Sequence, residues 1–236
     1  LGKVSLGEGR TKKRGELEQI VRYHAQGRDG LLITHQDTEE LLPELPADVT
    51  HFNAIRGLDT FKDKNLLIVA GRSQPSEDAI FRTTEALFYK DTEQINRSSY
   101  GQTVRSYRTR EGNVSVETDC LIDPRAESIR YLKSEGELLQ VLHRLRLVRR
   151  EDPVKIILAT KVPLPIRVDK LSRWKDLIPS RTDKILREGV WLDSHTHRAA
   201  AFGGNPRTHK RLARPAIPEH WIEVKYQLKA VGTRPA

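Results

Sequence analysis

The chain has 236 residues, 37% of them hydrophobic, which is enough to form a core in one large domain or in a domain with an appendage. Its 41 Lys and Arg outnumber its 32 Asp and Glu, and the net charge of +9 favours polyanionic partners such as nucleic acid, with the general solubility of a basic protein as the alternative explanation. A single cysteine, Cys120, permits no internal disulfide and predicts a reducing, cytoplasmic setting. No apolar run reaches the roughly 20 residues of a membrane helix, so we expect no membrane partner.

Periodic apolar residues and capping residues predict alternating helices and strands along most of the chain. In chain order the expected elements are a loose segment (1–14), a helix (16–26), a strand (30–34), a short helix begun by Asp37, a brief strand (49–52), a strand (65–70), a helix capped by Ser76 (76–89), a β-hairpin (100–118), a long helix (125–147) and a strand (153–160). This alternation predicts an α/β fold, with an open, mostly parallel sheet flanked by helices. The hairpin turns at Glu111-Gly112-Asn113 and is expected as an insertion in that pattern.

The composition changes at Pro163, where the sequence becomes basic and punctuated by prolines. We therefore expect one domain over 1–162, followed over 163–236 by a linker that wraps it and a basic C-terminal extension. In that extension we expect helices over 183–190 and 206–214, then a strand over 221–229. A basic helix followed by a strand is compatible with the end of a winged-helix module and equally with an ordinary solvated face.

Several kinds of chemistry lack their sequence patterns. No phosphate loop of the form GxxxxGK followed by Ser or Thr is present, so no nucleotide cradle is expected in this chain. His195 and His197, with Asp193 and His209 nearby, have no second Cys or His cluster, and we expect no metal site. No motif for a Ser or Cys nucleophile is present either.

Arginine is the functional residue type that remains. The long helix ends with Gln140, Arg144 and Arg146, and the chain continues to Arg149 and Arg150. The guanidinium group is planar and permanently charged, which suits it to phosphate oxygens and to charge that develops on a transferred phosphoryl group. The alternative is a basic helix end that complements the helix dipole, worth about 0.3–1 kcal/mol per residue.

The order of these motifs resembles the second RecA-like domain of superfamily-two helicases, over roughly residues 30–165. Arg56-Gly57-Leu58-Asp59 matches the RG-apolar-D motif of that family, and Gln140 and Arg144 match its later QxxGR motif. Within the superfamily, the occurrence of the RG-apolar-D motif together with the later Gln and Arg motif is similar to the helicase-like C-terminal part of primase-helicase proteins from phages, plasmids and integrated elements. The chain departs from the motif at His143, where the family has Gly, and at Arg146, which falls one position early.

The resemblance implies a RecA-like fold that contributes to an ATP and Mg²⁺ site between two RecA-like domains. Arg56, Gly57 and Asp59 would line the nucleotide cleft, and Arg144 or Arg146 would be the arginine finger, with Gln140 beside it. The first RecA-like domain, which holds the phosphate loop, has no match here, so we expect no ATP hydrolysis by this chain alone. Nucleic-acid contacts, with DNA favoured over RNA, are expected from Arg149, Arg150, Arg207, Lys210 and Arg211.

Two other functions stay open at this point. One is a degenerate helicase-like domain that binds only nucleic acid or a partner protein. The other is a small nuclease or nucleotide-modifying enzyme, which the lack of an acidic cluster disfavours. The sequence has no methionine, which indicates a fragment of a longer replication or mobile-element protein, or missing methionine positions.

Overall fold

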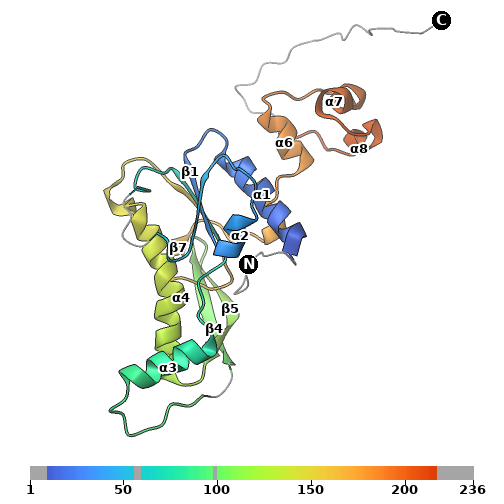
Figure 1. Cartoon of the computed structure of the whole chain (residues 1–236). Helices are drawn as coiled ribbons and strands as arrows, with labels where there is room; N and C mark the ends of the chain where they lie inside the picture. Colours follow the sequence, from blue (N-terminus) through green and yellow to red (C-terminus); the bar gives the residue numbers. More distant parts are fainter. Residues whose placement is uncertain (1–9, 56–59, 98–99, 217–236) are drawn as a thin grey trace, which may run out of the picture. The chain divides into compact units, whose positions relative to one another are not determined.

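The computed structural model describes residues 10–55, 60–97 and 100–216, and the chain divides into two compact units between Pro179 and Ser180 (Figure 1). The helices described in the first unit are α1 (Thr11–Ala25), α2 (Gln36–Glu40), α3 (Glu77–Leu87), α4 (Pro124–Arg144), the 3₁₀ turn η2 (Leu147–Arg149) and α5 (Trp174–Leu177). Its strands are β1 (Gly30–Thr34), β2 (Asp48–His51), β3 (Leu66–Ala70), β4 (Tyr100–Thr109), β5 (Asn113–Leu121), β6 (Lys155–Ala159) and β7 (Arg167–Val168).

The central sheet has four parallel strands in the order β2-β1-β3-β6, which confirms the expected α/β fold. The inner strands β1 and β3 are buried at every position, because helices cover both faces of the sheet. From β1 the chain runs to β2 on one side and then crosses to β3 on the other. The carboxyl ends of β1 and β3 therefore form a topological switch point, the place where open α/β sheets bind ligands.

Alternate residues of the strands face two different helices, as the twofold periodicity of a strand requires. Leu67 and Val69 of β3 belong to the cluster that packs on the carboxyl-terminal half of α4. Leu66 and Ile68 belong to the cluster on the opposite face, which α1 covers through Leu17 and Val21. Figure 1 shows α1 and α4 on opposite sides of the sheet.

The expected hairpin is confirmed as the antiparallel pair β4 and β5, which turn at Gly112 with a φ of 133°. It belongs to a second sheet of order β5-β4-β7, since β7 pairs in parallel with the end of β4. The hairpin lies beside the amino-terminal half of α4, and α3 crosses the same end of that helix (Figure 1).

Several helix boundaries differ from the sequence prediction. The helix α1 begins at Thr11, so the last residues of the supposed loose segment are helical. The N-cap of α2 is His35, and Asp37 lies in the first turn, where its charge complements the helix dipole. The helix α4 begins at Pro124, where the Asp123 carboxylate accepts from the backbone N–H of Arg125, and it ends at Arg144, three residues early.

Residues 163–179 belong to the first unit, so the expected boundary at 162/163 falls inside it. Leu164 is buried on the α4 face of the sheet. Trp174 and Leu177 pack on the α1 face, and the Trp174 Nε1 donates to the Glu16 carboxylate at 2.5 Å. The prolines break regular structure, but the apolar residues between them hold this segment on the sheet.

The described part of the second unit contains α6 (Arg181–Arg187), α7 (His195–Phe202) and α8 (Pro206–Lys210). Ser180 and Asp183 form a capping box that starts α6, close to the expected start at Asp183. The helix α7 was not predicted, and the strand expected over 221–229 lies outside the described residues. Among the described helices, none has both the length and the low polarity that crossing a bilayer requires.

Candidate nucleotide and nucleic-acid interface

The crossover from β2 to β3 contains the RG-apolar-D motif, and its described flanks pack against α4. Ile55, before the motif, is buried in the same cluster as Leu142 and Leu145 near the end of α4. Phe61, after the motif, packs against that cluster as well. Arg56, Gly57 and Asp59 themselves lie outside the described residues. Both flanks of the motif therefore meet the half of α4 that contains Gln140 and Arg144.

The Arg150 side chain binds the backbone of the same crossover. Its Nη1 donates to the carbonyl oxygens of Lys62 at 2.8 Å and Lys64 at 2.6 Å, and its Nη2 lies 3.4 Å from the carbonyl oxygen of Asp63. The sequence analysis assigned Arg150 to nucleic acid. In the structure its guanidinium anchors the turn that leads into β3.

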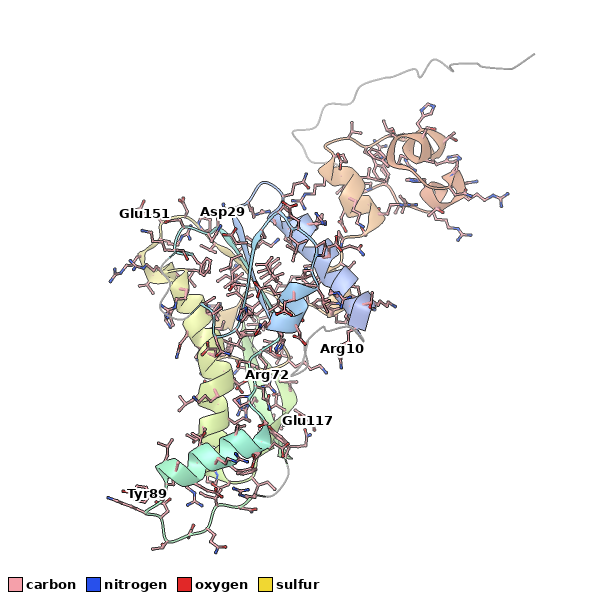
Figure 2. The ribbon with its side chains drawn as sticks, viewed as in Figure 1. Arg10, Asp29, Arg72, Tyr89, Glu117 and Glu151 are labelled. Atoms are coloured by element: carbon pink, nitrogen blue, oxygen red, sulfur yellow. The ribbon has the colours of Figure 1, made fainter. Side chains whose placement is uncertain are left out.

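This turn lies at the amino edge of the central sheet. Lys64 Nζ is 2.6 Å from Asp29, just before β1, and 2.6 Å from Asp48, at the start of β2. Burial acts to lower the pKa of Lys64, but its bonds to the two carboxylates outweigh burial and raise the pKa. Figure 2 shows Asp29 and Glu151 at one end of the first unit and Arg72 away from them. The end of α4 and the last turn of the crossover thus share the amino edge.

Gln140 and Arg144 are four residues apart on α4 and so lie on one face of the helix. Gln140 is exposed and Arg144 is half-buried. Arg146 follows the end of α4 with a φ of 49°, in the left-handed region, and Arg149 is exposed on the 3₁₀ turn. The helix geometry therefore aligns Arg144 with Gln140, whereas Arg146 follows a break in the helix.

The carboxyl edge of the sheet holds an arginine that the sequence analysis did not assign. Gly71 ends β3 with a φ of 99°, a conformation that glycine adopts without strain, and its N–H donates to the carbonyl oxygen of Ala159 at 3.1 Å. The next residue, Arg72, is 6% exposed. Its Nη1 is buried and forms no hydrogen bond with any described residue. This atom lies 3.9 Å from the Glu135 carboxylate.

Arg72 borders a buried network of ionic groups on β4 and α4. Glu135 and Arg130 are paired by bonds of 2.7 and 3.0 Å, and Arg130 also binds Glu127 at 2.7 and 2.8 Å. Arg105 of β4 donates to Glu135 at 2.8 Å and to Glu127 at 2.7 Å. Three guanidinium groups thus share two carboxylates within this network.

Burial and pairing oppose each other in this network. Burial acts to raise the pKa of Glu127. The hydrogen bonds from Arg130 and from the Leu121 backbone outweigh burial, so the pKa is lowered overall. For Arg130, the bonds to the two carboxylates outweigh burial and raise the pKa. Burial lowers the pKa of Arg72, whose pairing is weakest. The network is therefore held in its ionised form by its own contacts.

The second unit is built around a buried arginine. Arg198 is stacked on the Trp191 ring at 4.5 Å and donates to the carbonyl oxygens of Leu192, of Asp193 at 2.9 Å and of His209 at 3.0 Å. The His209 ring is buried and bonds the carbonyl oxygen of Gly203 at 2.9 Å. The cations expected to contact nucleic acid, Arg207, Lys210 and Arg211, are all exposed on or just after α8.

No family model, curated protein or solved structure matches the chain. The interpretation of the site therefore depends on its own geometry. Within the described ranges, no group of three His, Cys, Asp or Glu side chains is placed to hold a metal ion.

Sequence motifs pointed to residues near the amino edge, such as Arg144, and to none at the carboxyl edge. Arg72 follows a buried strand through a glycine, and this Gly-Arg pair at a strand end was the available signal. The network partners Arg105 and Glu135 give no such signal, because their burial depends on the docking of the hairpin against α4.

Proposed function

We propose that this chain is a RecA-like domain of the helicase C-terminal type, from a replication or mobile-element protein. It binds nucleic acid, with DNA favoured over RNA, and supplies an arginine to an ATP site that a first RecA-like domain completes. The parallel sheet flanked by helices is compatible with that fold. The observation that carries the proposal is the packing of Ile55 and Phe61, which flank the RG-apolar-D motif, against the helix of Gln140 and Arg144.

Arg144 is the arginine finger in this proposal. It is half-buried and lies one helical turn after Gln140, so its guanidinium has a restricted direction and a polar neighbour on the same face. A planar, permanently charged group stabilises the charge that develops on the γ-phosphate oxygens. Arg56, Gly57 and Asp59 line the cleft, and Mg²⁺ with the phosphate loop comes from the other domain.

The nucleic-acid contacts of the proposal come from exposed cations. Arg149 on the 3₁₀ turn and Arg207, Lys210 and Arg211 in the second unit are accessible to phosphates. Each phosphate contact releases condensed counterions, so affinity for a single strand falls as salt rises. Arg150 is excluded from this set, since it binds three backbone carbonyls.

The first experiment measures binding of a fluorescent single-stranded DNA by anisotropy over a series of salt concentrations. We expect a Kd that rises steeply with salt, and we expect Arg144→Ala to leave this Kd unchanged, because Arg144 serves the nucleotide. The same preparation should not turn over ATP. Brisk, DNA-stimulated ATP hydrolysis that Arg144→Ala abolishes would contradict the claim that the chain supplies only part of the site.

A second candidate is a degenerate domain that binds nucleic acid without any ATP role. The exposure of the cations on α8, which belong to a separate compact unit, favours it. The two candidates differ in the response of Arg144 to MgATP. When a first RecA-like domain that carries the phosphate loop is supplied in trans together with MgATP, the side-chain Nε–Hε NMR signal of Arg144 should shift in the first case. An unmoved Arg144 signal together with salt-sensitive DNA binding favours the second.

A further inference from the structure

A cavity of about 480 Å³ opens at the carboxyl edge of the central sheet, and the proposed function does not use it. Its lining comes from the segment after β2, the segment after β3, the first turns of α3 and the middle of α4. Since β1 lies between β2 and β3, the cavity lies beyond the carboxyl end of β1. This is the switch point of the sheet, at the edge opposite the turn of residues 62–64.

The lining of the cavity is about half polar and half apolar. Pro75 and Ala79 supply accessible apolar surface, whereas Ile80 and Ile129 also line the cavity but are only 1% and 7% exposed. Asn53 and Gln74 supply two amides. Pockets of this size that combine apolar surface with a few convergent polar groups bind small organic ligands. A flat heterocycle with apolar faces and polar edges matches this lining.

Gln74 has a buried hydrogen-bonding atom without a partner. Its Nε2 donates to the Tyr100 hydroxyl at 2.7 Å, while its Oε1 is buried and bonds nothing. If the amide is turned by 180°, the nitrogen becomes the buried atom without a partner. One amide atom therefore lacks a hydrogen bond whichever way oxygen and nitrogen are assigned. Buried polar groups in native proteins are satisfied with few exceptions. A ligand edge in the cavity would satisfy this one.

Asn53 holds its amide at the cavity with an uncommon backbone. Its φ is 74°, in the left-handed region, where Asn is tolerated better than most residues and where strain is concentrated at functional sites. The backbone of this turn is fixed by bonds on both sides, from Phe52 N–H to Thr34 at 3.0 Å and from Ala54 N–H to His51 at 3.2 Å. Asn53 is exposed, so its amide is accessible to a ligand.

Lys133 gives the cavity a positive rim. It lines the cavity from α4, is exposed, and forms no ion pair with any residue that the structure describes. Arg72 immediately precedes the lining residues Ser73 and Gln74. The cavity therefore combines a partly apolar lining, two amides and the exposed cation of Lys133, which together suit a heterocycle that carries a phosphate.

We infer that this cavity binds one nucleotide unit. Its heterocycle lies against Pro75 and Ala79, its polar edge bonds the amides of Gln74 and Asn53, and its phosphate contacts Lys133. Asn and Gln amides bond the edge of adenine in protein–DNA complexes. The inference rests on the proposed function where the nucleotide belongs to a bound single strand. A free nucleoside monophosphate offers the same chemistry.

The test compares two tryptophan variants on α3. Ala79→Trp fills the cavity from its lining, whereas Ala86→Trp places the same ring on an exposed part of the same helix outside the lining. Binding of a fluorescent single-stranded DNA is measured by anisotropy over a series of salt concentrations. We expect Ala79→Trp to weaken binding about tenfold, as for the loss of one base contact, with an unchanged salt slope. Ala86→Trp should behave as the wild type.

Two further variants make the result independent of whether Ala79→Trp folds. Gln74→Leu removes the amide while keeping the size of the side chain, and Lys133→Gln removes an exposed charge. We expect about tenfold weaker binding for Gln74→Leu with the slope retained, and a slope reduced by about 0.7 for Lys133→Gln. Arg82→Gln, which removes an exposed cation of α3 outside the lining, is the charge control.

A separate arm titrates adenosine or thymidine 5′-monophosphate into the isotope-labelled chain by NMR. Wild-type strand binding that none of the cavity variants weakens overturns the cavity inference and leaves the proposed function intact. Monophosphate binding that Ala79→Trp abolishes, in a chain that binds no strand, supports the cavity and overturns the proposed function. A chain that binds neither strand nor monophosphate overturns both.

Discussion

Arg130 and Glu135 form an ion pair inside the first unit, with side chains only 1% and 0% exposed. Both carboxylate oxygens of Glu135 accept from Arg130, at 2.7 and 3.0 Å, and Arg105 of the hairpin donates to the same carboxylate at 2.8 Å. Arg72, two residues after β3, lies 3.9 Å from the same carboxylate. One carboxylate thus connects the central sheet, α4 and the hairpin.

Glu135→Gln should destabilise the first unit strongly. The substitution keeps the shape of the side chain but leaves three guanidinium groups with one carboxylate, and removing one partner of a buried ion pair costs about 3–5 kcal/mol. Urea unfolding followed by circular dichroism measures the change. Glu18→Gln is the matched control, because the Glu18–Arg22 pair is largely exposed and its loss should cost well under about 1 kcal/mol. Equal effects of the two variants would show that the buried network adds no stability.

Leu138→Ala should destabilise the same unit through a cavity in the core. Leu138 is fully buried between α4 and the sheet, and truncation of a buried leucine costs about 2–5 kcal/mol. Leu132 is on the same helix but 61% exposed, so Leu132→Ala should change the free energy of unfolding by less than about 0.5 kcal/mol. Thermal or urea unfolding of both variants decides the point. A large effect at Leu132 would mean that an unseen partner covers it.

Leu132 also shows where sequence patterns stop being informative. Among the leucines of this helix, Leu138 and Leu142 are buried, whereas Leu132 is exposed. The amino-terminal half of α4 packs instead on α3 and β5 through Ala126 and Ile129, which leaves Leu132 in solvent. A local pattern marks an apolar stripe, but which part of the stripe is covered depends on tertiary partners.

The central strands and the hairpin were predictable for local reasons. Runs such as 66–70 are short, continuous and apolar, and the Gly112 turn joins two alternating segments. The carboxyl-edge site was not predictable in this way. Arg72, Gln74 and Lys133 come from separate elements, and only the crossover and the packing of α3 on α4 bring their segments together.

The stability of the first unit should fall as the pH falls below about 6.5, in part because of His35. Burial lowers the pKa of His35, and its ring packs edge-on against Phe52 at 5.3 Å with its Nε2 buried and unbonded. The neutral form is therefore favoured by folding. The unfolded chain binds the proton first, so this stability is complete above the unfolded pKa and is lost between that value and the lower folded pKa.

His35→Phe should flatten this part of the pH profile, because it keeps a ring against Phe52 and removes the titrating group. The measurement is the urea midpoint of wild type and variant from pH 5 to pH 8. The carboxylates whose pKa values are lowered, such as Glu127, act at more acidic pH and should contribute equally to both curves. Parallel curves for the two proteins would exclude His35 as the source.

The exposed cations of the second unit should determine the salt dependence of nucleic-acid binding. Replacing Arg207, Lys210 and Arg211 together by Gln removes three charges from α8 and its end, and none of the three is used in the buried contacts around Arg198. With about 0.7 counterions released per single-strand phosphate contact, the slope of log K against log salt should decrease by about 2. A control triple at Lys90, Lys170 and Lys175 removes the same charge from exposed positions of the first unit. If both triples reduce the slope equally, net charge and not a defined surface governs binding, and the assignment of α8 as a phosphate-contacting helix is wrong.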